Sequence, residues 1–349
     1  MKALILVGGY GTRLRPLSLS QPKPLVDFAN KPMVLHQLEA LAAAGVDTIV
    51  LAVSYRAEML EKEMSIQATR LGIQIKFSVE EQLGLLGAVR TFKKLEPQSL
   101  PGWLWLENIC KAAIHSLFSI LIYYCRHQIN MALSYSTKGS GEIERFVEKP
   151  QEYVGNKINA GMYILNPSVL DRIKLEPTSI EKDVFPFMAE NHELYAFILP
   201  GFWMDVGQPK DFLKGMKLYL NHVSKTPELS VQLAKGDNIV GPVLVDKTAK
   251  IGNGGLIGPN VVIGANVRLD DGVRIMDSTV LSDTVIQTHS YVRDSIIGWK
   301  CNIGKWVRIE NCSVIGEDVV VKDELYLNGA RVLPNKSIAS NVPEPDIIM

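Results

Sequence analysis

The sequence predicts an α/β, Rossmann-like domain with a mainly parallel sheet, followed by a parallel β-helix. Three observations carry this prediction. Strand and helix patterns alternate through the first half of the chain, a glycine-rich turn follows the first apolar run, and aliphatic residues recur every six positions towards the C-terminus. Strands separated by helices form parallel sheets with right-handed crossovers, and such sheets bind ligands at the carboxyl ends of their strands.

The elements of the first half follow from the spacing of apolar residues. The run Ala3–Val7 predicts a buried strand. Apolar residues at helical spacing after Pro32 predict a helix that ends near Gly45. Further strands are expected at 48–53 and 73–77, with a charged helix between them.

The last third of the chain carries a six-residue repeat. The repeated aliphatic residues are Val245, Ile251, Ile257, Ile263, Leu269, Ile275 and Leu281, and then Ile297, Ile303, Ile309, Ile315, Val321 and Leu327. This repeat predicts a three-sided β-helix, for which we expect the left-handed form, with one inward aliphatic residue on each side of each coil. β-Helical acyltransferases place their chemistry in loops inserted into the repeat, and this repeat has no long insertion. We therefore expect the β-helix to serve assembly and regulation. The predicted domains are residues 1–225 and 241–349, joined by a polar linker at 226–240.

Composition and charge exclude several classes of protein. The 349 residues include 37 Lys and Arg and 37 Asp and Glu, so neither nucleic acid nor an acidic membrane surface is an expected partner. The four cysteines form no Cys-x-x-Cys pair, which favours free thiols in a reducing compartment. The first strand leaves no room for a signal peptide, and charged residues interrupt the apolar stretch Trp103–Cys125. We therefore expect a cytoplasmic protein that does not cross a membrane.

The glycine turn after the first strand indicates a phosphate site. Gly8, Gly9 and Gly11 allow backbone N–H groups to face phosphate oxygens. Arg13 and Lys23 supply the cations that a nucleoside triphosphate needs. The turn is neither a dinucleotide fingerprint nor a P-loop, because the third glycine and the Gly-Lys-Ser/Thr string are missing. A tight turn with solvated basic residues is the alternative interpretation.

Longer strings resemble the sugar-1-phosphate nucleotidylyltransferases. These strings are Gly-Gly-x-Gly-Thr-Arg-Leu-x-Pro-Leu from residue 8, Pro-Lys-Pro-Leu from residue 22, Glu-Lys-Pro from residue 148, Asn-Ala-Gly from residue 159 and Trp-x-Asp-x-Gly from residue 203. The resemblance covers residues 1–82 and 142–349. It is most specific to members that make GDP-mannose and pyrophosphate, and so implies GTP and mannose 1-phosphate as substrates.

The resemblance also implies roles for individual residues. The implied catalytic residues are Arg13, Lys23 and Lys149. The implied nucleotide-binding residues are Leu6, Gly8, Gly9, Gly11, Thr12 and Gly84. The implied sugar-phosphate ligands are Glu148, Lys149, Asn159 and Gly161. Asn159 is expected to begin a strand, with an ordinary turn before a strand as the alternative. Asp205 is the implied carboxylate for Mg²⁺, with a helix cap before Pro209 as the alternative.

Residues 83–141 depart from the family pattern. Leu85 and Leu86 replace small residues of the turn that contacts the base, and the strand expected at Trp103–Leu106 ends in Glu107 instead of aspartate. Glu107 is a tentative second metal ligand, with a solvated strand-end residue as the alternative. An active enzyme, a catalytically weak paralogue that senses GDP-mannose, and an aberrant product all stay open. The expected assembly is a homo-oligomer, with a regulatory paralogous subunit as a further partner.

Overall fold

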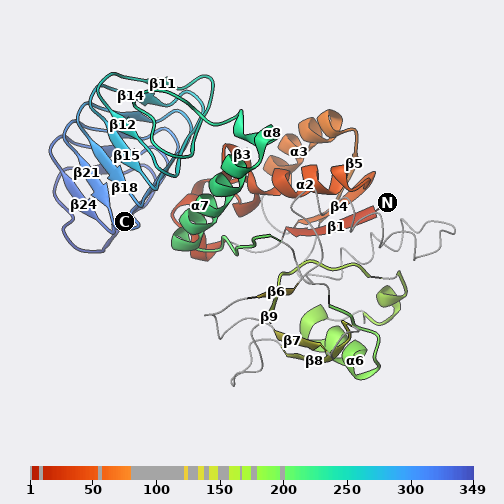
Figure 1. The fold of residues 1–349 in the computed structure, drawn as a ribbon. Coiled ribbons are helices and arrows are strands. Elements are labelled where there is room, and N and C mark those ends of the chain that lie inside the picture. Colours follow the sequence, from red (N-terminus) through yellow and green to blue (C-terminus); the bar gives the residue numbers. More distant parts are fainter. Residues whose placement is uncertain are drawn as a thin grey trace. The chain divides into compact units, whose positions relative to one another are not determined.

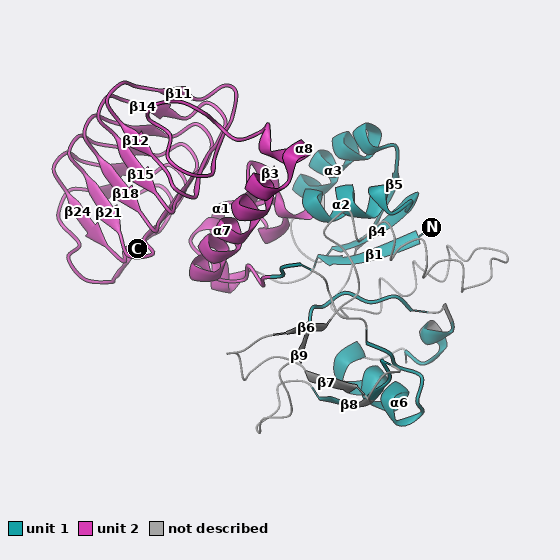
Figure 2. Cartoon of the chain, viewed as in Figure 1, with its two compact units in different colours: residues 1–9, 35–203 teal, residues 10–34, 204–349 magenta. Residues whose placement is uncertain are grey.

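The chain is described by a computed structural model, which covers residues 2–7, 11–53, 57–79, 122–124, 133–136, 141–147, 157–165, 167–173, 179–196 and 201–349. The structure divides into two compact units (Figures 1 and 2). Unit 1 contains residues 1–9 and 35–203, and unit 2 contains residues 10–34 and 204–349. The N-terminal segment after the glycine turn thus groups with the C-terminal part of the chain.

Unit 1 is built around a parallel sheet with the order β1-β4-β5. Its elements are β1 (Lys2–Val7), α2 (Met33–Ala43, whose first residues belong to unit 2), β4 (Thr48–Val53), α3 (Ala57–Leu71) and β5 (Gln74–Val79). The predicted strands and helices of this region are confirmed, and Gly45 follows α2 with a φ of +82°. All of β4 is buried, but β1 is only partly buried and Leu6 is 55% exposed. The predicted first strand is therefore confirmed, but the prediction that it is buried was wrong.

The rest of unit 1 consists of short elements. They are β6 (Ile122–Tyr124) paired with β9 (Lys157–Asn159), β7 (Leu133–Ser136) paired with β8 (Ile143–Val147), η3 (Pro167–Asp171), η4 (Ile180–Val184) and α6 (Phe185–Glu190). Both pairs are antiparallel. The ring of Phe185 packs edge-on against Phe146 and Tyr163 at 5.2 and 4.7 Å, which joins α6 to β8. The expected strand at Trp103–Leu106 lies outside the described residues.

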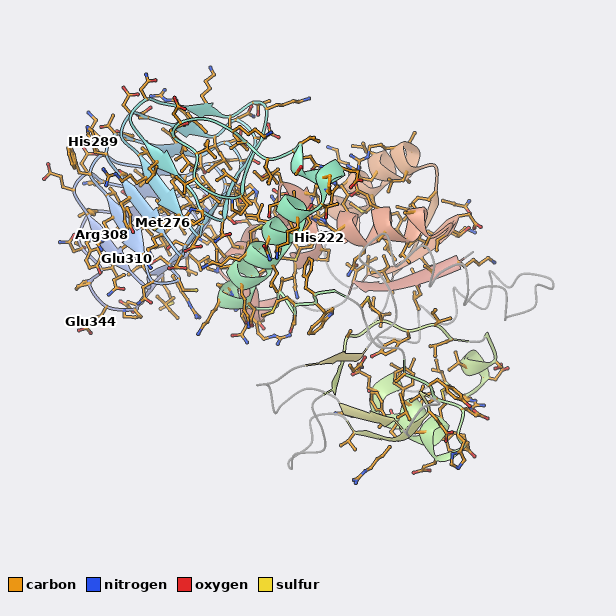
Figure 3. All side chains as sticks on the ribbon, viewed as in Figure 1. His222, Met276, His289, Arg308, Glu310 and Glu344 are labelled. Carbon is orange, nitrogen blue, oxygen red and sulfur yellow. The ribbon has the colours of Figure 1, made fainter. Side chains whose placement is uncertain are left out.

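The C-terminal part of unit 2 is the predicted parallel β-helix. One sheet contains β10 (Val243–Val245), β13 (Val261–Ile263), β16 (Thr279–Val280), β19 (Ile296–Ile297), β22 (Val314–Ile315), β25 (Arg331–Val332) and β27 (Ile347–Ile348). A second contains β11 (Lys250–Ile251), β14 (Arg268–Leu269), β17 (Val285–Ile286), β20 (Asn302–Ile303), β23 (Val320–Val321) and β26 (Ser337–Ile338). The third contains β12 (Leu256–Ile257), β15 (Arg274–Met276), β18 (Tyr291–Arg293), β21 (Arg308–Glu310) and β24 (Tyr326–Asn328). Arg308 and Glu310 on the third sheet pair outside the core and are labelled in Figure 3.

The interior of the β-helix is the predicted stack of aliphatic residues, with one correction. Every position of the repeat except Leu281 belongs to the core cluster inside the β-helix or packs against it. Leu281 lies instead in the cluster outside the β10–β27 sheet, and Val280 takes the interior place. The register shift explains this: Val243 pairs with Val261 eighteen residues later, but Ile263 pairs with Val280 only seventeen residues later. A strict six-residue period fails where a coil loses one residue.

Successive coils approach too closely for larger groups at the corners. A Cβ atom on Gly298 would lie 2.6 Å from the carbonyl oxygen of Gly316 in the next coil. The Cys301 thiol donates to the same oxygen at 3.0 Å. Burial raises the pKa of Cys301 to about 12, so this thiol stays protonated and unreactive. Cys301 and Cys312 are free, as predicted.

Two chain segments cover the β10–β27 sheet from outside. The first segment holds η1 (Thr12–Leu14), α1 (Leu17–Ser20), η2 (Lys23–Leu25), β2 (Asp27–Phe28) and β3 (Lys31–Pro32), and the second holds α7 (Pro209–Lys225) and α8 (Pro227–Ser230). Phe28 packs edge-on against Phe212 and Tyr219 of α7, with ring centroids 5.2 and 6.0 Å apart. Both segments share one apolar cluster with Val262, Leu281, Ile296, Trp299 and Val314.

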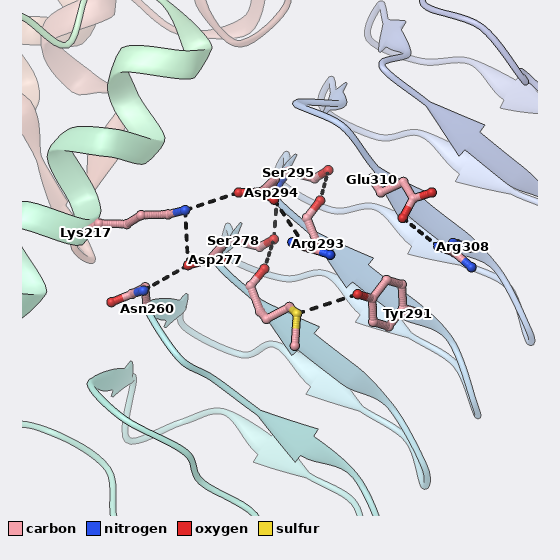
Figure 4. A network of polar contacts seen from close by, with 11 residues as sticks. Lys217, Asn260, Asp277, Ser278, Tyr291, Arg293, Asp294, Ser295, Arg308 and Glu310 are labelled. Carbon is pink, nitrogen blue, oxygen red and sulfur yellow. Dashed lines mark hydrogen bonds and ion pairs between the residues drawn. The ribbon is translucent and has the colours of Figure 1, made fainter.

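Polar contacts also bind α7 to the β-helix. The Lys217 ammonium lies 3.1 Å from Asp277 and 3.2 Å from Asp294, which occupy corners of adjacent coils (Figure 4). Asn260 donates to the same Asp277 oxygen at 2.9 Å. Burial lowers the pKa of Lys217, but its bonds to the two carboxylates outweigh burial and raise the pKa above 10.5. Lys217 is therefore charged and bridges two coils.

Candidate active site

The glycine turn closes on Lys23. Gly11 has a φ of +60°, and a Cβ atom there would lie 3.1 Å from Ser18 Cβ and 3.2 Å from Lys23 Cβ. The Gly11 carbonyl accepts hydrogen bonds from the Leu14 N–H at 2.9 Å and from the Ser18 hydroxyl at 2.7 Å. Glycine is therefore required here both for backbone conformation and for space. Sequence reasoning missed Ser18, since an isolated serine gives no signal.

Lys23 lies in a half-buried position between two prolines. Its turn is closed by the Leu25 N–H, which donates to Pro22 at 2.8 Å, and by the Val26 N–H, which donates to Lys23 at 3.1 Å. Burial lowers the pKa of Lys23, the Asp205 carboxylate raises it, and Arg13 lowers it, with a net lowering. The three charged groups thus act on one another within unit 2. The two cations, Lys23 and Arg13, face one carboxylate, Asp205. The cluster therefore has excess positive charge, which suits a polyphosphate ligand.

Asp205 and Arg13 meet over Gly207. A Cβ atom on Gly207 would lie 3.0 and 3.3 Å from the two Asp205 carboxylate oxygens and 3.4 Å from Arg13 Cζ. The glycine of the Trp-x-Asp-x-Gly string therefore makes room for this pair. The alternative role of Asp205 as a helix cap is not realised, because α7 begins after Gln208 and has no side-chain cap.

The Asn159 turn forms a separate polar network in unit 1. Asn159 Nδ2 donates to the Tyr163 hydroxyl at 2.5 Å and to Glu181 Oε1 at 3.2 Å, and Asn159 Oδ1 accepts from the Gly161 N–H at 2.9 Å. The Tyr163 hydroxyl donates to Glu181 Oε1 at 2.6 Å. Gly161 has a φ of +72° and is exposed. Asn159 ends β9 instead of beginning a strand, so that expectation was wrong.

The Trp203 side chain packs on the Asn159 turn within unit 1. Ala160 is 8% exposed and packs with Met162 and Trp203. Asp205 follows Trp203 by two residues, so the aromatic residue of the Trp-x-Asp-x-Gly string anchors the chain just before the carboxylate. Sequence reasoning assigned no role to Tyr163 and Glu181, because their contacts span 18 residues without a periodic pattern.

Several candidate site residues lie outside the described residues or outside the two groups of side chains described above. Gly8, Gly9, Gly84, Glu107, Glu148 and Lys149 lie outside the described residues. Leu6 belongs to β1 of unit 1, and Thr12 begins η1 with an exposed side chain. The described part of the site therefore consists of two groups, the Gly11–Arg13–Lys23–Asp205 cluster and the Asn159 network.

Asp205 is a carboxylate that could hold a divalent cation. Among the described residues, no three or more His, Cys, Asp or Glu side chains gather as a metal cage. A single carboxylate beside two cations suits an ion that takes most of its ligands from phosphate oxygens and water. Within the described ranges, no helix has the length and apolar character of a membrane span.

These features define a nucleotide-handling enzyme of the α/β type with a β-helical extension. The Nucleotidyl transferase family model matches residues 2–222, and the model for the GMPPB C-terminal domain matches residues 239–348. The chain belongs to the nucleotidyl transferase family, which confirms the resemblance and generally uses a divalent metal.

Curated relatives match over the full chain. The mannose-1-phosphate guanylyltransferase catalytic subunit beta of Drosophila melanogaster is 53% identical over 363 residues, which cover all of this chain and 97% of that protein. The mannose-1-phosphate guanyltransferase beta-A of Xenopus laevis and the mannose-1-phosphate guanyltransferase of Eremothecium gossypii are each 53% identical, over 367 and 364 residues, and both match along their whole lengths. These spans exceed the 349 residues of this chain, so the relatives carry residues that have no counterpart here.

Proposed function

We propose that the protein transfers a guanylyl group from GTP to mannose 1-phosphate, which forms GDP-mannose and releases pyrophosphate. The observation that carries the proposal is the cluster of Arg13, Lys23 and Asp205 around Gly11 and Gly207. The names of the relatives support GTP and mannose 1-phosphate as the substrates. They give no support to the alternative of a GDP-mannose-sensing regulatory subunit.

The reaction is an in-line displacement at phosphorus. An oxygen of the sugar phosphate attacks the α-phosphorus of GTP, the bond to the β-phosphate oxygen breaks, and pyrophosphate leaves. No covalent enzyme intermediate is required, so catalysis depends on positioning and charge neutralisation. Arg13 and Lys23 neutralise the triphosphate, and the backbone of the glycine turn, including Gly8, Gly9 and Gly11, cradles it.

The remaining proposed roles follow the family pattern. Leu6, Thr12 and Gly84 contact the nucleotide, and Glu148, Lys149, Asn159 and Gly161 hold the sugar phosphate. Asp205 would hold Mg²⁺, with Glu107 as a tentative second ligand. A bound Mg²⁺ supplies charge neutralisation on the phosphates. The proposal further places the protein in the cytoplasm as a homo-oligomer, with a regulatory paralogous subunit as partner, and light scattering tests the homo-oligomer.

The test is pyrophosphate release by the purified full-length chain. We expect release that requires GTP, mannose 1-phosphate and Mg²⁺ together, and that stops when a chelator removes the metal. ATP in place of GTP, and glucose 1-phosphate in place of mannose 1-phosphate, serve as substrate controls. A folded protein that binds GTP but releases no pyrophosphate contradicts the proposal.

A further inference from the structure

The phosphate-binding segment, residues 11–34, obtains its stability from the β-helix. Its helices and strands are two to four residues long, too short to be stable alone. Nevertheless Leu14, Leu17 and Val26 are 0% exposed. Their cover comes from α7 and from the outer face of the β10–β27 sheet, through Phe212, Leu213, Met216, Leu220, Val262, Leu281, Ile296, Trp299 and Val314.

Hydrogen bonds fix the segment in register with the coils. The Trp299 indole N–H donates to Asp27 Oδ2 at 3.1 Å, and Asn30 Nδ2 donates to the Ile263 carbonyl at 2.8 Å. The Ser20 hydroxyl also donates to the Glu317 carboxylate. Trp299 is only 4% exposed, so water is largely excluded from its hydrogen bond to Asp27. A hydrogen bond to a carboxylate is stronger than one between two neutral groups.

Backbone hydrogen bonds link the segment that contains Asp27 to Lys23. Val26 donates its N–H to Lys23 at 3.1 Å and accepts from the Met33 N–H at 3.1 Å, so the lysine turn and the β2–β3 hairpin form one hydrogen-bonded loop. A shift of Asp27 would move Lys23 relative to Asp205 and Arg13. Displacements near 1 Å in such sites cost large factors in rate.

We propose that Trp299 is a positioning residue for the phosphate site: its bond to Asp27 holds the Lys23 loop in place from the β-helix. This inference rests on the proposed function of the Arg13–Lys23–Asp205 cluster. It gives the β-helix a part in substrate handling that is independent of assembly. Trp299 acts through Asp27 and does not itself touch substrate.

The test compares the same substitution at two tryptophans of the full-length protein. Trp299→Phe keeps most of the ring and removes the N–H donor. Trp306→Phe is the matched control, because Trp306 is 61% exposed at another corner and stacks on His289 with centroids 4.4 Å apart. We expect Trp299→Phe to lower kcat/KM for GTP about tenfold and to weaken binding of inorganic tripolyphosphate with Mg²⁺ equally. The KM for mannose 1-phosphate and the kinetics of Trp306→Phe should stay within twofold of wild type.

A double-mutant cycle separates positioning from general destabilisation. Asp27→Ala should lose at least as much as Trp299→Phe, and the double variant no more than Asp27→Ala, because the bond between Trp299 and Asp27 can be lost only once. Strictly additive losses, or a lowered Tm with unchanged tripolyphosphate binding, would overturn the proposal. So would wild-type protein that does not bind tripolyphosphate. Binding without formation of GDP-mannose would contradict the proposed function alone, and the cycle would then be measured on binding.

Discussion

Tyr163 donates its hydroxyl hydrogen to Glu181 at 2.6 Å, and Asn159 donates to the same hydroxyl at 2.5 Å. The Asn159 side chain is therefore engaged within the protein through both its amide nitrogen and its oxygen. What the network fixes is the conformation of the exposed Gly161 turn. In the proposed function, Asn159 acts on the sugar phosphate by shaping this turn.

Loss of the Tyr163 hydroxyl should weaken sugar-phosphate binding selectively. Tyr163→Phe removes the hydroxyl that accepts from Asn159 and donates to Glu181, leaves the direct bond from Asn159 to Glu181, and keeps the ring packed on Phe185. We expect the KM for mannose 1-phosphate to rise about threefold to tenfold, the usual scale for one hydrogen bond, with the KM for GTP unchanged. Tyr195→Phe, at a 60% exposed position, is the control. Equal changes in both KM values would refute this role.

Removal of the Lys23 charge should abolish most of the activity. Lys23→Ala deletes one preorganised cation, and we expect a loss of about 2–4 kcal/mol in transition-state stabilisation, seen as a 30- to 1000-fold drop in kcat/KM. Lys235→Ala, an exposed lysine outside the cluster, should match wild type. Steady-state kinetics with GTP varied measures both. An unchanged kcat/KM in Lys23→Ala would remove Lys23 from the mechanism.

Thr279→Val should stabilise the protein. Thr279 is 1% exposed, its hydroxyl oxygen has no hydrogen-bond partner among the described residues, and it stands in register between Val262 and Ile296. Replacing an unsatisfied hydroxyl with a methyl group should raise the free energy of unfolding by about 1 kcal/mol. Thr284→Val is the matched contrast, because the Thr284 hydroxyl donates to Gly298 at 2.7 Å and accepts from the Cys301 N–H at 3.1 Å. That variant should be destabilised, and denaturant unfolding of both checks the sign.

The Lys217 bridge should contribute stability that disappears at high pH. The pKa of Lys217 is raised in the folded protein, so its contribution is fully present below the ordinary lysine pKa of 10.5 and is lost as pH rises through the folded value. Lys217→Met leaves Asp277 and Asp294 without their shared cation. We expect its unfolding free energy to fall below wild type at pH 8 and the gap to narrow above pH 10.5. Lys214→Met, an exposed position of α7, should show no such gap, and a gap that is constant with pH would contradict the assignment.

The local elements could be predicted because their causes are local. The helix at α2 follows from apolar spacing between a proline and a glycine, and the β-helix follows from a repeat in which each coil repeats the same burial. Leu281 was misplaced because coil length changes from eighteen to seventeen residues, and no single residue announces that change. The expectation that Asn159 begins a strand came from the family resemblance, whereas in the structure Met162 packs on Ala160 and Tyr163 packs on Phe185.

The residue types of the candidate site could be predicted from the sequence, but the tertiary contacts that hold these residues in place could not. Glycines and cations near a strand end predict a phosphate site through simple chemistry, and the structure brings Gly11, Arg13, Lys23 and Asp205 together. The contact between Asp27 and Trp299 joins residues 272 positions apart and leaves no periodic trace in the sequence. Tertiary contacts of this kind depend on how two distant segments pack against each other. The local sequence of either segment does not show this packing.

The cover over residues 11–34 also has a consequence for the order of synthesis. This segment leaves the ribosome well before Val262, Leu281, Ile296 and Val314, which follow it in the chain. Domains usually fold as they emerge, and contacts between distant residues form late. A nascent chain that ends before Val262 would therefore lack the part of the cover over Leu14, Leu17 and Val26 that the β-helix supplies. Residues 11–34 therefore reach their final packing only after the coils that contain Val262, Leu281, Ile296 and Val314 have been translated.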